Sequence, residues 1–298
     1  MEPHWDDMKV FLAVAREESL SGAGRILRMD PATVGRRITR LEAALEASLF
    51  VKSPQGYALS AAGERLLSHG EQAEEAMRAA GEALTGPADR LTGQIRIGAP
   101  DGCANYLLPQ VCTQISAENP DLDIQILALP RVINLSRREA DMAVTVSPPT
   151  AGQLLVQKIT DYKLHLVAHR RYLRRNPEIR NVEDLRGHPM IGYIPDMIFD
   201  RELDYLSDLG IKRVMLASNS VSVQLRLAAG ATGLCVAHDF TLPSHRRLAK
   251  VLPDQISLTR SFYLVRHQGD RRSERLNRFA AALSAGIRDE VARLEGLT

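Results

Sequence analysis

The stretch Ser21–Leu49, SGAGRILRMDPATVGRRITRLEAALEASL, decides the fold of the first part of this chain. It predicts a short helix over residues 21–27, a turn over residues 28–30 and a longer helix from Pro31. Asp30 can accept a hydrogen bond from the free N–H groups of the new helix, and Pro31 suits its first position. Two helices joined by a three-residue turn are common in helical proteins in general, so the turn alone does not decide the function.

The longer helix has two unlike faces. One face is apolar, and its residues recur at steps of four, three and four: Val34, Ile38, Leu41 and Leu45. The opposite face is polar and basic: Thr33, Arg36, Arg37 and Arg40. A helix with an apolar back and a basic front, behind a short helix and a turn, has the shape that enters a DNA major groove. The alternative is a charged face that is merely solvated.

Length and composition indicate a protein of two domains. The chain has 298 residues, of which 45% are hydrophobic and 25% charged, as in ordinary globular proteins. No apolar run is long enough to cross a bilayer and the N-terminus lacks a signal-peptide pattern, so we expect a cytoplasmic protein. The formal net charge is only +2, but residues 25–52 carry six Lys or Arg against three Asp or Glu. The basic charge therefore gathers on the predicted helix pair.

Elements on both sides complete a winged unit. The sequence WDDMKVFLAVAREE at residues 5–18 predicts a helix that packs against the back of the helix pair. Residues 50–59 form two short extended runs around Ser53-Pro54-Gln55-Gly56, which predict a hairpin. A hairpin directly after a recognition helix is a wing whose tip lies near the DNA backbone. Lys52 is the one cation in that sequence.

Ser60 is expected to cap a helix over residues 61–84. The small and apolar positions of this helix follow steps of four and three: Leu66, Gly70, Ala73, Met77, Ala80 and Leu84. Such a shallow heptad seam lets two helices approach closely. We expect a dimer helix, because it would place two recognition helices on the half-sites of one duplex. The alternative is a helix packed on its own domain.

Thr85-Gly86-Pro87 ends that helix and is the expected domain boundary and hinge. Strands and helices then alternate, which predicts an α/β domain with a mostly parallel sheet. Strands are predicted at residues 94–99, 123–129, 141–146, 163–169, 189–194, 213–217, 234–237 and 261–266. Helices are predicted at residues 105–118, 133–139, 172–175, 199–209, 221–229 and 273–294.

These segments together resemble the LysR-type transcriptional regulators. FLAVAREESLSGAGRIL, PATVGRRITRLEAALEASLF and LSAAGERLL follow the order and spacing of the family's winged helix-turn-helix and linker helix. GQIRIGA, NPDLDIQI, READMAV and AAGATGLCVA each resemble a recurrent segment of the family's C-terminal part. The resemblance covers nearly all of the chain.

The resemblance implies a winged helix-turn-helix DNA-binding domain at residues 1–60 and a linker and dimerisation helix with the hinge at residues 61–92. It also implies an effector-binding α/β domain at residues 93–298 with a two-lobed periplasmic-binding-protein-like fold. Lobe I would hold about residues 93–162 and 268–298, and lobe II about residues 163–267.

The resemblance also implies which residues contact DNA. Ala32, Thr33 and Arg36 are the positions that meet base edges. Arg36 could pair with a guanine, while Ala32 and the Thr33 methyl group suit a thymine methyl. The phosphate contacts would come from three cations: Arg37, Arg40 and Lys52. For Arg37 and Arg40 the alternatives are a solvated face or an ion pair with Glu42 or Glu46.

The groove-facing helix departs from the family pattern at its start. Many members have Ser-Gln-Pro or Ser-Gln-Ser there and a serine before the arginine. This chain has Asp30-Pro31-Ala32 and Gly35, and its wing lacks the arginines that are common in the family. We expect the same mode of docking with a different sequence preference, in which Arg36 and Thr33 carry an unusual share of the base recognition.

The family binds a small molecule in the cleft between its lobes. Ligands of α/β sheets sit outside the carboxyl ends of parallel strands. That rule selects these loop residues as candidates for effector binding: Pro100, Asp101, Gly102, Cys103, Pro130, Arg131, Ser147, Asn219, Ser220 and His238.

Asp101 departs from the family at the effector site. Members frequently have Ser or Thr near this position, where a hydroxyl and a helix N-terminus can hold a carboxylate. A carboxylate at position 101 would repel an anion. We therefore expect an effector that is neutral, polar or cationic, or one whose acid group is held elsewhere, for example by Arg131. The alternative is that Asp101 only caps the helix that begins near Gly102.

Other candidate sites have weaker support. The three cysteines, Cys103, Cys112 and Cys235, are too widely spaced to suggest a disulfide framework. A redox switch through Cys103 and Cys235 competes with the commoner role of a small buried hydrophobe. His165 and His169 lack a third ligand, so no metal is expected. The absence of a phosphate loop, a nucleophile elbow and paired catalytic acids leads us to expect no cofactor and no enzyme activity.

Two functions compete at this stage. The first is a cytoplasmic transcriptional regulator that binds promoter or operator DNA as a homodimer or homotetramer, is controlled by a small-molecule effector and does not associate with membranes. The second is a cytoplasmic solute-binding or enzymatic α/β protein whose N-terminal helices serve oligomerisation. Missing secretion signals and missing catalytic constellations favour the first.

Overall fold

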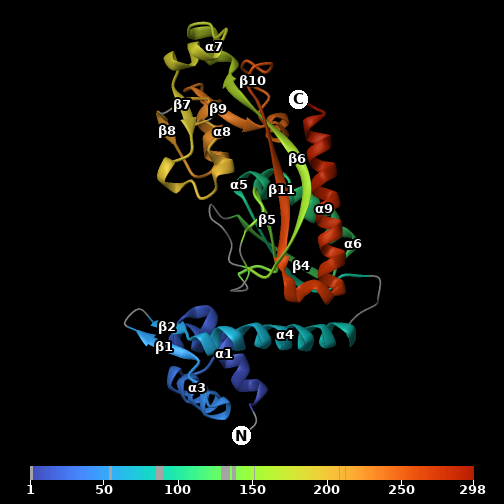
Figure 1. Cartoon of the computed structure of the whole chain (residues 1–298). Helices are drawn as coiled ribbons and strands as arrows, with labels where there is room; N and C mark the ends of the chain where they lie inside the picture. Colours follow the sequence, from blue (N-terminus) through green and yellow to red (C-terminus); the bar gives the residue numbers. More distant parts are fainter. Residues whose placement is uncertain are drawn as a thin grey trace. The chain divides into compact units, whose positions relative to one another are not determined.

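The computed structural model describes residues 3–53, 56–84, 90–128, 135, 139–150, 152–207, 209–211 and 213–298, without the side chains of residues 52, 53, 75, 78, 79 and 82–84. The chain divides into two compact units. The first is built chiefly from Met1–Ala88, and the second from Asp89–Leu135, Glu139–Gln268 and Glu274–Thr298. Figure 1 labels their helices and strands. The predicted hinge at Gly86-Pro87 lies outside the described residues.

Three helices open the first unit at nearly the predicted bounds: α1 (Trp5–Glu17), α2 (Leu20–Leu27) and α3 (Pro31–Leu45). Side chains cap the second and third helices. Ser19 Oγ accepts a hydrogen bond from Gly22 N at 3.2 Å, and Asp30 Oδ1 accepts one from Ala32 N at 2.8 Å. Each cap satisfies a backbone N–H that has no partner inside its helix. The predicted start of α3 at Pro31 is confirmed.

The apolar face of α3 forms part of the core of the first unit. Val34, Ile38 and Leu41 are buried, and they belong to the same cluster as Phe11 and Leu12 of α1. Full burial of a side chain of this size contributes about 1.5–3 kcal/mol relative to exposure. The predicted apolar back of the helix is therefore confirmed, and it fixes which face of α3 is left to solvent.

The predicted wing is a two-stranded antiparallel hairpin. β1 (Phe50–Ser53) pairs with β2 (Gly56–Leu59). α4 (Ala61–Leu84) then begins where expected, because Ser60 Oγ accepts a hydrogen bond from Gly63 N at 3.0 Å. A Cβ atom on Gly63 would lie only 2.1 Å from the carbonyl oxygen of Leu49. The start of α4 therefore sits directly against the backbone that enters the wing.

The two ends of α4 have different surroundings. Near its start, a Cβ atom on Gly70 would lie 3.1 Å from side-chain atoms of Met8 and Leu12 in α1. Beyond this point Met77 is 59% exposed. The first part of the predicted seam therefore packs on its own unit, and the second part leaves an apolar side chain in solvent.

The described part of the second unit holds a nine-stranded mixed sheet in the order β4-β3-β5-β11-β6-β9-β7-β8, with β10 paired to β6. Its strands are β3 (Gly93–Ala99), β4 (Leu122–Ala128), β5 (Met142–Thr145), β6 (Leu154–His169), β7 (Met190–Gly192), β8 (Leu216–Ala217), β9 (Leu234–His238), β10 (Leu248–Lys250) and β11 (Ser257–His267). Strands β3, β4 and β5 pair in parallel in one half of the sheet, and strands β7, β8 and β9 in the other.

Two long strands, β6 and β11, join these halves (Figure 1). They are antiparallel to each other, and β11 is antiparallel to β5 and β6 to β9. The prediction of a mostly parallel sheet was therefore wrong, since the joining strands run against their neighbours. The sequence revealed only residues 163–169 and 261–266 of these strands, because the first part of β6 is largely exposed and lacks a continuous apolar run.

The second unit contains five α-helices in its described residues: α5 (Asp101–Tyr106), α6 (Leu108–Glu118), α7 (Arg170–Arg175), α8 (Val221–Ala229) and α9 (Glu274–Glu295). Short 3-10 helices lie at Val182–Gly187, Pro195–Met197, Arg201–Leu203, Asp239–Ser244 and Gln268–Arg272. In Figure 1, α9 runs alongside β6. The prediction of α8 at residues 221–229 is confirmed.

Two helix predictions differ from the structure. The segment predicted as one helix at residues 105–118 is divided between α5 and α6, because Pro109, in the first turn of α6, lacks the N–H that would continue the hydrogen bonds of α5. The prediction of a helix at residues 199–209 was wrong, since the described part of that segment holds only a 3-10 turn at Arg201–Leu203 and further turns. Most of the predicted helix at residues 133–139 lies outside the described residues.

Candidate DNA interface and effector site

The first candidate site is the exposed face at the start of α3. Ala32 and Arg36 are exposed and Thr33 is half-buried. Arg36 Nη2 donates a hydrogen bond to Thr33 Oγ1 at 2.8 Å. One turn of helix therefore presents a methyl group, a hydroxyl and a guanidinium side by side. The opposite face of the same helix is buried in the core.

Arg37 and Arg40 have a different environment, although they lie on the same helix. Arg40 Nε donates to Asp7 Oδ2 at 2.6 Å, and its Nη2 also contacts the second oxygen of Asp7. Arg37 Nη1 lies 3.8 Å from Asp7 Oδ1. Hydrogen bonding to Asp7 raises the pKa of Arg40. The intradomain ion pair considered for these arginines therefore exists, but its acid is Asp7 of α1.

Neither of the two acids suggested by the sequence pairs with these arginines in the structure. Glu42 Oε1 accepts hydrogen bonds from Leu49 N at 2.7 Å and Phe50 N at 3.4 Å, which ties α3 to the wing. Glu46 ends α3 in the left-handed conformation, with φ 50°. Proximity on one helix face suggested both acids, whereas Asp7 is 33 residues from Arg40 in the chain.

A hollow of about 350 Å³ lies between α3 and the wing. Its lining residues are Gly35, Arg36, Ile38, Thr39, Glu42, Phe50 and Tyr57. Position 35, where many family members have serine, therefore opens onto this hollow. Lys52 lies on β1, but its side chain is outside the described part of the structure.

The second candidate site lies where α5 meets α8 in the second unit. Asp101, the first residue of α5, accepts hydrogen bonds from Ser220 Oγ at 3.1 Å and from Ser222 N and Oγ at 3.0 and 3.2 Å. Asn105 Nδ2 donates to Asp101 Oδ1 at 3.1 Å. α5 follows β3 and α8 precedes β9, so these bonds connect the two halves of the sheet.

His238 lies at the same junction, at the end of β9. A Cβ atom on Gly102 would lie 3.3 Å from His238 Cε1, so the imidazole rests against the backbone of α5. The rings of Tyr162 and Phe240 have centroids 5.4 and 4.9 Å from that of His238. Burial lowers the pKa of His238 to about 4, and its Nδ1 has no hydrogen-bond partner among the described residues. The ring is therefore neutral at physiological pH.

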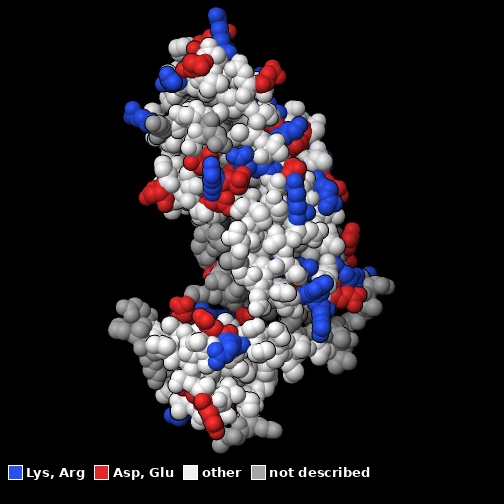
Figure 2. Space-filling view, viewed as in Figure 1, with Lys and Arg blue, Asp and Glu red and all other residues white. Residues whose placement is uncertain are grey.

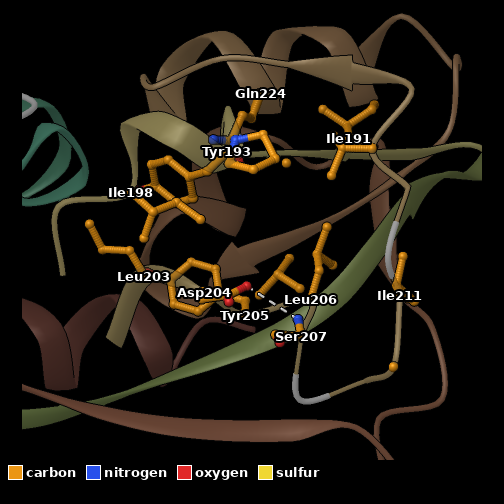
Figure 3. Close-up of a pocket in the computed structure, with 15 residues that line it drawn as sticks. Ile191, Tyr193, Ile198, Leu203, Asp204, Tyr205, Leu206, Ser207, Ile211 and Gln224 are labelled. Atoms are coloured by element: carbon orange, nitrogen blue, oxygen red, sulfur yellow. Dashed lines mark hydrogen bonds between the residues drawn. The ribbon is translucent and has the colours of Figure 1, made fainter. Parts of the chain in front are cut away.

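A pocket of about 350 Å³ opens in the β7–β9 half of the sheet (Figure 3). The side chains that define its chemistry are Tyr193, Tyr205, Leu206 and Gln224. Tyr205 also stacks edge-on against His238, with ring centroids 6.1 Å apart. The pKa of Tyr193 is raised by burial and by the nearby Asp101 carboxylate. The pocket is therefore next to the α5–α8 junction, and aromatic and apolar groups dominate it.

The structure brings together only some of the predicted effector residues. Pro100 precedes α5, and Asp101, Gly102, Ser220 and His238 meet at the junction of α5 with α8. The other described candidates lie apart from these contacts: Cys103 is buried in the core, Ser147 Oγ donates to Asp200 and Asn219 is half-buried. Pro130 and Arg131 lie outside the described residues.

Sequence reasoning missed several residues of this site. Ser222 follows the predicted Ser220 by two positions, and the start of α8 could have indicated it as a donor. Tyr193 follows β7, where the rule for parallel strands applies. Tyr205 lies in the segment that the sequence predicts as a helix at residues 199–209, and that incorrect helix hides the position of Tyr205 beside the pocket.

Three buried cysteines give no support to a redox switch. Burial raises the pKa of all three thiols. The pKa of Cys112 is raised to about 11 and that of Cys235 to about 12. Thiols react with oxidants as thiolates, and these thiols are protonated at neutral pH. Their environments instead fit small core side chains.

The two histidines considered as a pair have structural partners. His165 Nδ1 lies 2.7 Å from Asp239 Oδ1, and His169 Nδ1 accepts from Arg171 N at 2.9 Å at the start of α7. Within the described part of the chain, no three His, Cys, Asp or Glu residues gather so as to hold a metal ion. None of the helices in the described residues is long and apolar enough to cross a bilayer.

Figure 2 shows one face of the molecule, on which acidic and basic side chains are intermixed. This agrees with the small formal net charge of +2. Any contact with DNA phosphates must therefore depend on local cations rather than on the electrostatic potential of the whole protein.

Sequence profiles of known families match both units. Residues 5–64 match the profile described as "Bacterial regulatory helix-turn-helix protein, lysR family". Residues 88–288 match the profile described as "LysR substrate binding domain". The two matches have the order that the resemblance in the sequence implied.

Curated relatives are similar over most of the chain. The HTH-type transcriptional activator TtdR of Escherichia coli (strain K12) is 25% identical over 262 residues, which cover 83% of this chain and 82% of that protein. The HTH-type transcriptional regulator GltR of Bacillus subtilis is 23% identical over 260 residues, which cover 86% of each chain.

Solved structures share the fold. Full-length AphB of Vibrio cholerae has a TM-score of 0.57 and 23% identity, and the match covers 95% of this chain and 99% of that one. A full-length OxyR variant from Pseudomonas aeruginosa has a TM-score of 0.69 and 16% identity, with 96% and 97% covered. The winged helical unit, the mixed α/β sheet and both profile matches agree, so this chain belongs to the LysR family and is a transcriptional regulator with a helix-turn-helix DNA-binding domain and an effector-binding domain.

Proposed function

We propose that the start of α3 reads DNA bases in the major groove and that a small molecule bound at the α5–α8 junction controls this binding. The observation that carries the first part is the exposed Arg36–Thr33 pair on a helix whose back is buried. A rigid helix that presents a guanidinium can place two parallel N–H groups against guanine O6 and N7. The Thr33 methyl and Ala32 suit thymine methyl groups.

The other three cations are assigned to phosphate contacts. Arg40 is held by the buried carboxylate of Asp7, which orients its guanidinium while half of the side chain remains exposed. Arg37 is 28% exposed and shares the same carboxylate. We assign both arginines, together with Lys52, to the positioning of α3 on the DNA backbone, which carries little sequence information.

A gel-shift titration on DNA from upstream of the gene tests this division of roles. We expect Arg36→Ala to reduce the preference for the specific site over scrambled DNA by about 10- to 100-fold, which is the discrimination of one bidentate contact. Arg37→Ala is the matched control, since it should weaken binding to both DNA molecules equally and reduce the salt dependence. Discrimination that survives Arg36→Ala but is abolished by Arg40→Ala would overturn the assignment.

The proposed effector site includes the predicted Pro100, Asp101, Gly102, Cys103, Arg131, Ser147, Asn219, Ser220 and His238. We add Tyr193, Tyr205 and Gln224, because they line the pocket beside Asp101. The two halves of the sheet are joined by β6 and β11, so a ligand that prefers one arrangement of the halves would shift the population toward it. A change at this junction could then alter the spacing of recognition helices in an oligomer.

We further propose a cytoplasmic homodimer or homotetramer without enzyme activity. The exposed Met77 on the second part of α4 supports a helix-to-helix contact between copies. Family membership supports action on double-stranded promoter or operator DNA and argues against the reading in which the N-terminal helices serve only oligomerisation. The curated relatives are regulators, which supports the absence of a catalytic role.

A further inference from the structure

A carboxylate of the chain itself lies at the N-terminus of α8. Asp101 accepts hydrogen bonds from the hydroxyls of Ser220 and Ser222 and from the backbone N–H of Ser222, all between 3.0 and 3.2 Å. Ser220 also caps α8, since its Oγ accepts from Val223 N at 3.3 Å. The Ser220 hydroxyl therefore donates its proton to Asp101 and uses a lone pair for the helix.

The donors around Asp101 form a complete site for a carboxylate. Hydroxyl and backbone donors that point at one anion, at the positive end of a helix dipole, stabilise a negative charge. Asn105 adds a fourth donor group, from Nδ2 to Asp101 Oδ1 at 3.1 Å. Both oxygens of the carboxylate are engaged by these contacts. A carboxylate from another molecule could not use the same donors while Asp101 holds them.

The contact also crosses the second unit. Asp101 belongs to α5, which follows β3, and the serines begin α8, which leads into β9. Ser220 and Ser222 are 119 and 121 residues from Asp101 in the chain, and the helices that carry them belong to different halves of the mixed sheet. A bond between them therefore holds the two halves in the arrangement seen here.

We propose that Asp101 is an intrachain latch, whose carboxylate supplies the anion that the N-terminus of α8 binds and thereby excludes carboxylate ligands from that position. The halves are then held together without an anionic effector. This inference rests on the proposed function only in treating the α5–α8 junction as the effector site. It implies that the molecule recognised beside Asp101 is uncharged where it faces α8.

Removal of the carboxylate should create a vacant anion site that acetate can fill. In the full-length protein, Asp101→Gly removes a side chain whose terminal part is equivalent to acetate. We expect sodium acetate at millimolar concentrations to raise the melting temperature of Asp101→Gly in a saturable manner and sodium chloride at equal ionic strength to have no such effect. Wild type should not respond, because its site is already occupied.

Asp101→Asn is the matched control, since the amide keeps the size of the side chain and fills the site without charge. Its melting temperature should not respond to acetate. The proposal is wrong if wild type and Asp101→Gly respond equally to acetate, or if Asp101→Gly responds to neither acetate nor formate. If Asp101→Gly fails to fold, Asp101→Ser replaces it, because serine is shorter than aspartate and can still cap α5. The response of its melting temperature to acetate then decides the proposal in the same way.

A gel-shift with wild-type protein separates this inference from the proposed function. If wild type binds its upstream DNA and Asp101→Gly does not bind acetate, the latch fails while the regulator stands. If wild type does not bind DNA and Asp101→Gly still binds acetate, the proposed DNA recognition fails while the latch stands.

Discussion

At the scale of residues, Arg36 and Arg40 show how one helix face can hold two kinds of arginine. They are four positions apart and both are exposed. Arg36 contacts only the neighbouring Thr33 in the contacts described, whereas Arg40 is bound by a buried carboxylate from another helix. In the proposed DNA complex, the guanidinium of Arg36 would exchange its exposed hydrogen bond to Thr33 for a base edge more easily than that of Arg40, because Arg36 would leave no buried charge behind. Periodicity alone places both on the front of α3 and cannot distinguish them.

A buried histidine predicts how stability depends on pH. The pKa of His238 is lowered from 6.5 to about 4 because its charged form would be desolvated. The unfolded chain therefore binds a proton between pH 6.5 and 4 that the folded protein rejects, so stability is complete above this range and falls as pH falls through it. The lowered pKa corresponds to about 3 kcal/mol of stability at most. Urea unfolding at pH 7, 5.5 and 4.5 measures this loss.

The matched variant for this prediction is His238→Gln, which keeps a polar side chain but cannot titrate. Its free energy of unfolding should fall less steeply with pH than that of wild type. Identical slopes in the two proteins would show that other groups, such as His188, whose pKa burial also lowers, dominate the acid response.

At the scale of elements, the helices of the first unit follow from local signals. Asp30 and Pro31 begin α3, Ser60 begins α4 and a regular apolar spacing runs through both. The segment at residues 199–209 has the same kind of spacing, and Asp200 Oδ1 caps its first turn by accepting a hydrogen bond from Glu202 N at 2.9 Å, but the segment forms turns around the pocket instead of an α-helix. Packing of Tyr205 against His238 replaces the helical contacts there.

Close packing of α4 on the wing predicts unequal effects of two glycine substitutions. Gly63→Ala would force a Cβ atom to within 2.1 Å of the Leu49 carbonyl oxygen, so we expect a destabilisation of about 1–3 kcal/mol from overpacking. Gly81→Ala, in the same helix, meets nothing within 4 Å and should stabilise by about 0.5–1 kcal/mol through higher helix propensity. Thermal unfolding of both variants compares them. Equal losses would contradict this view of the α4–wing contact.

At the scale of the whole molecule, we propose that assembly of copies through α4 joins DNA recognition to effector binding. The second part of α4 leaves Met77 59% exposed. A large exposed apolar side chain on a helix with small neighbours fits a contact with a second copy. The two halves of the second unit are joined by β6 and β11 and bonded at Asp101, so ligand-dependent change has a defined junction on which to act.

A charge at position 77 should therefore weaken self-association. We expect Met77→Glu to raise the dimer dissociation constant at least tenfold, as measured by sedimentation over a concentration series, because the carboxylate would be desolvated in an apolar contact. Gln72→Glu adds the same charge on a different, exposed part of α4 and should leave association unchanged. The proposed role of α4 would be wrong if Met77→Glu associated like wild type.

The sequence by itself determined the winged helical unit, because caps, turns and the 3.6-residue period are local signals that need no distant partner. It also determined the family and the residues that front α3. Only the tertiary structure decided that Arg40 is bound to Asp7 and that Asp101 bonds to Ser220 and Ser222. Only it revealed that β6 and β11 run against their neighbours. Each of these facts depends on residues that are far apart in the chain. Tertiary packing, and not a local signal, decides whether such residues come into contact.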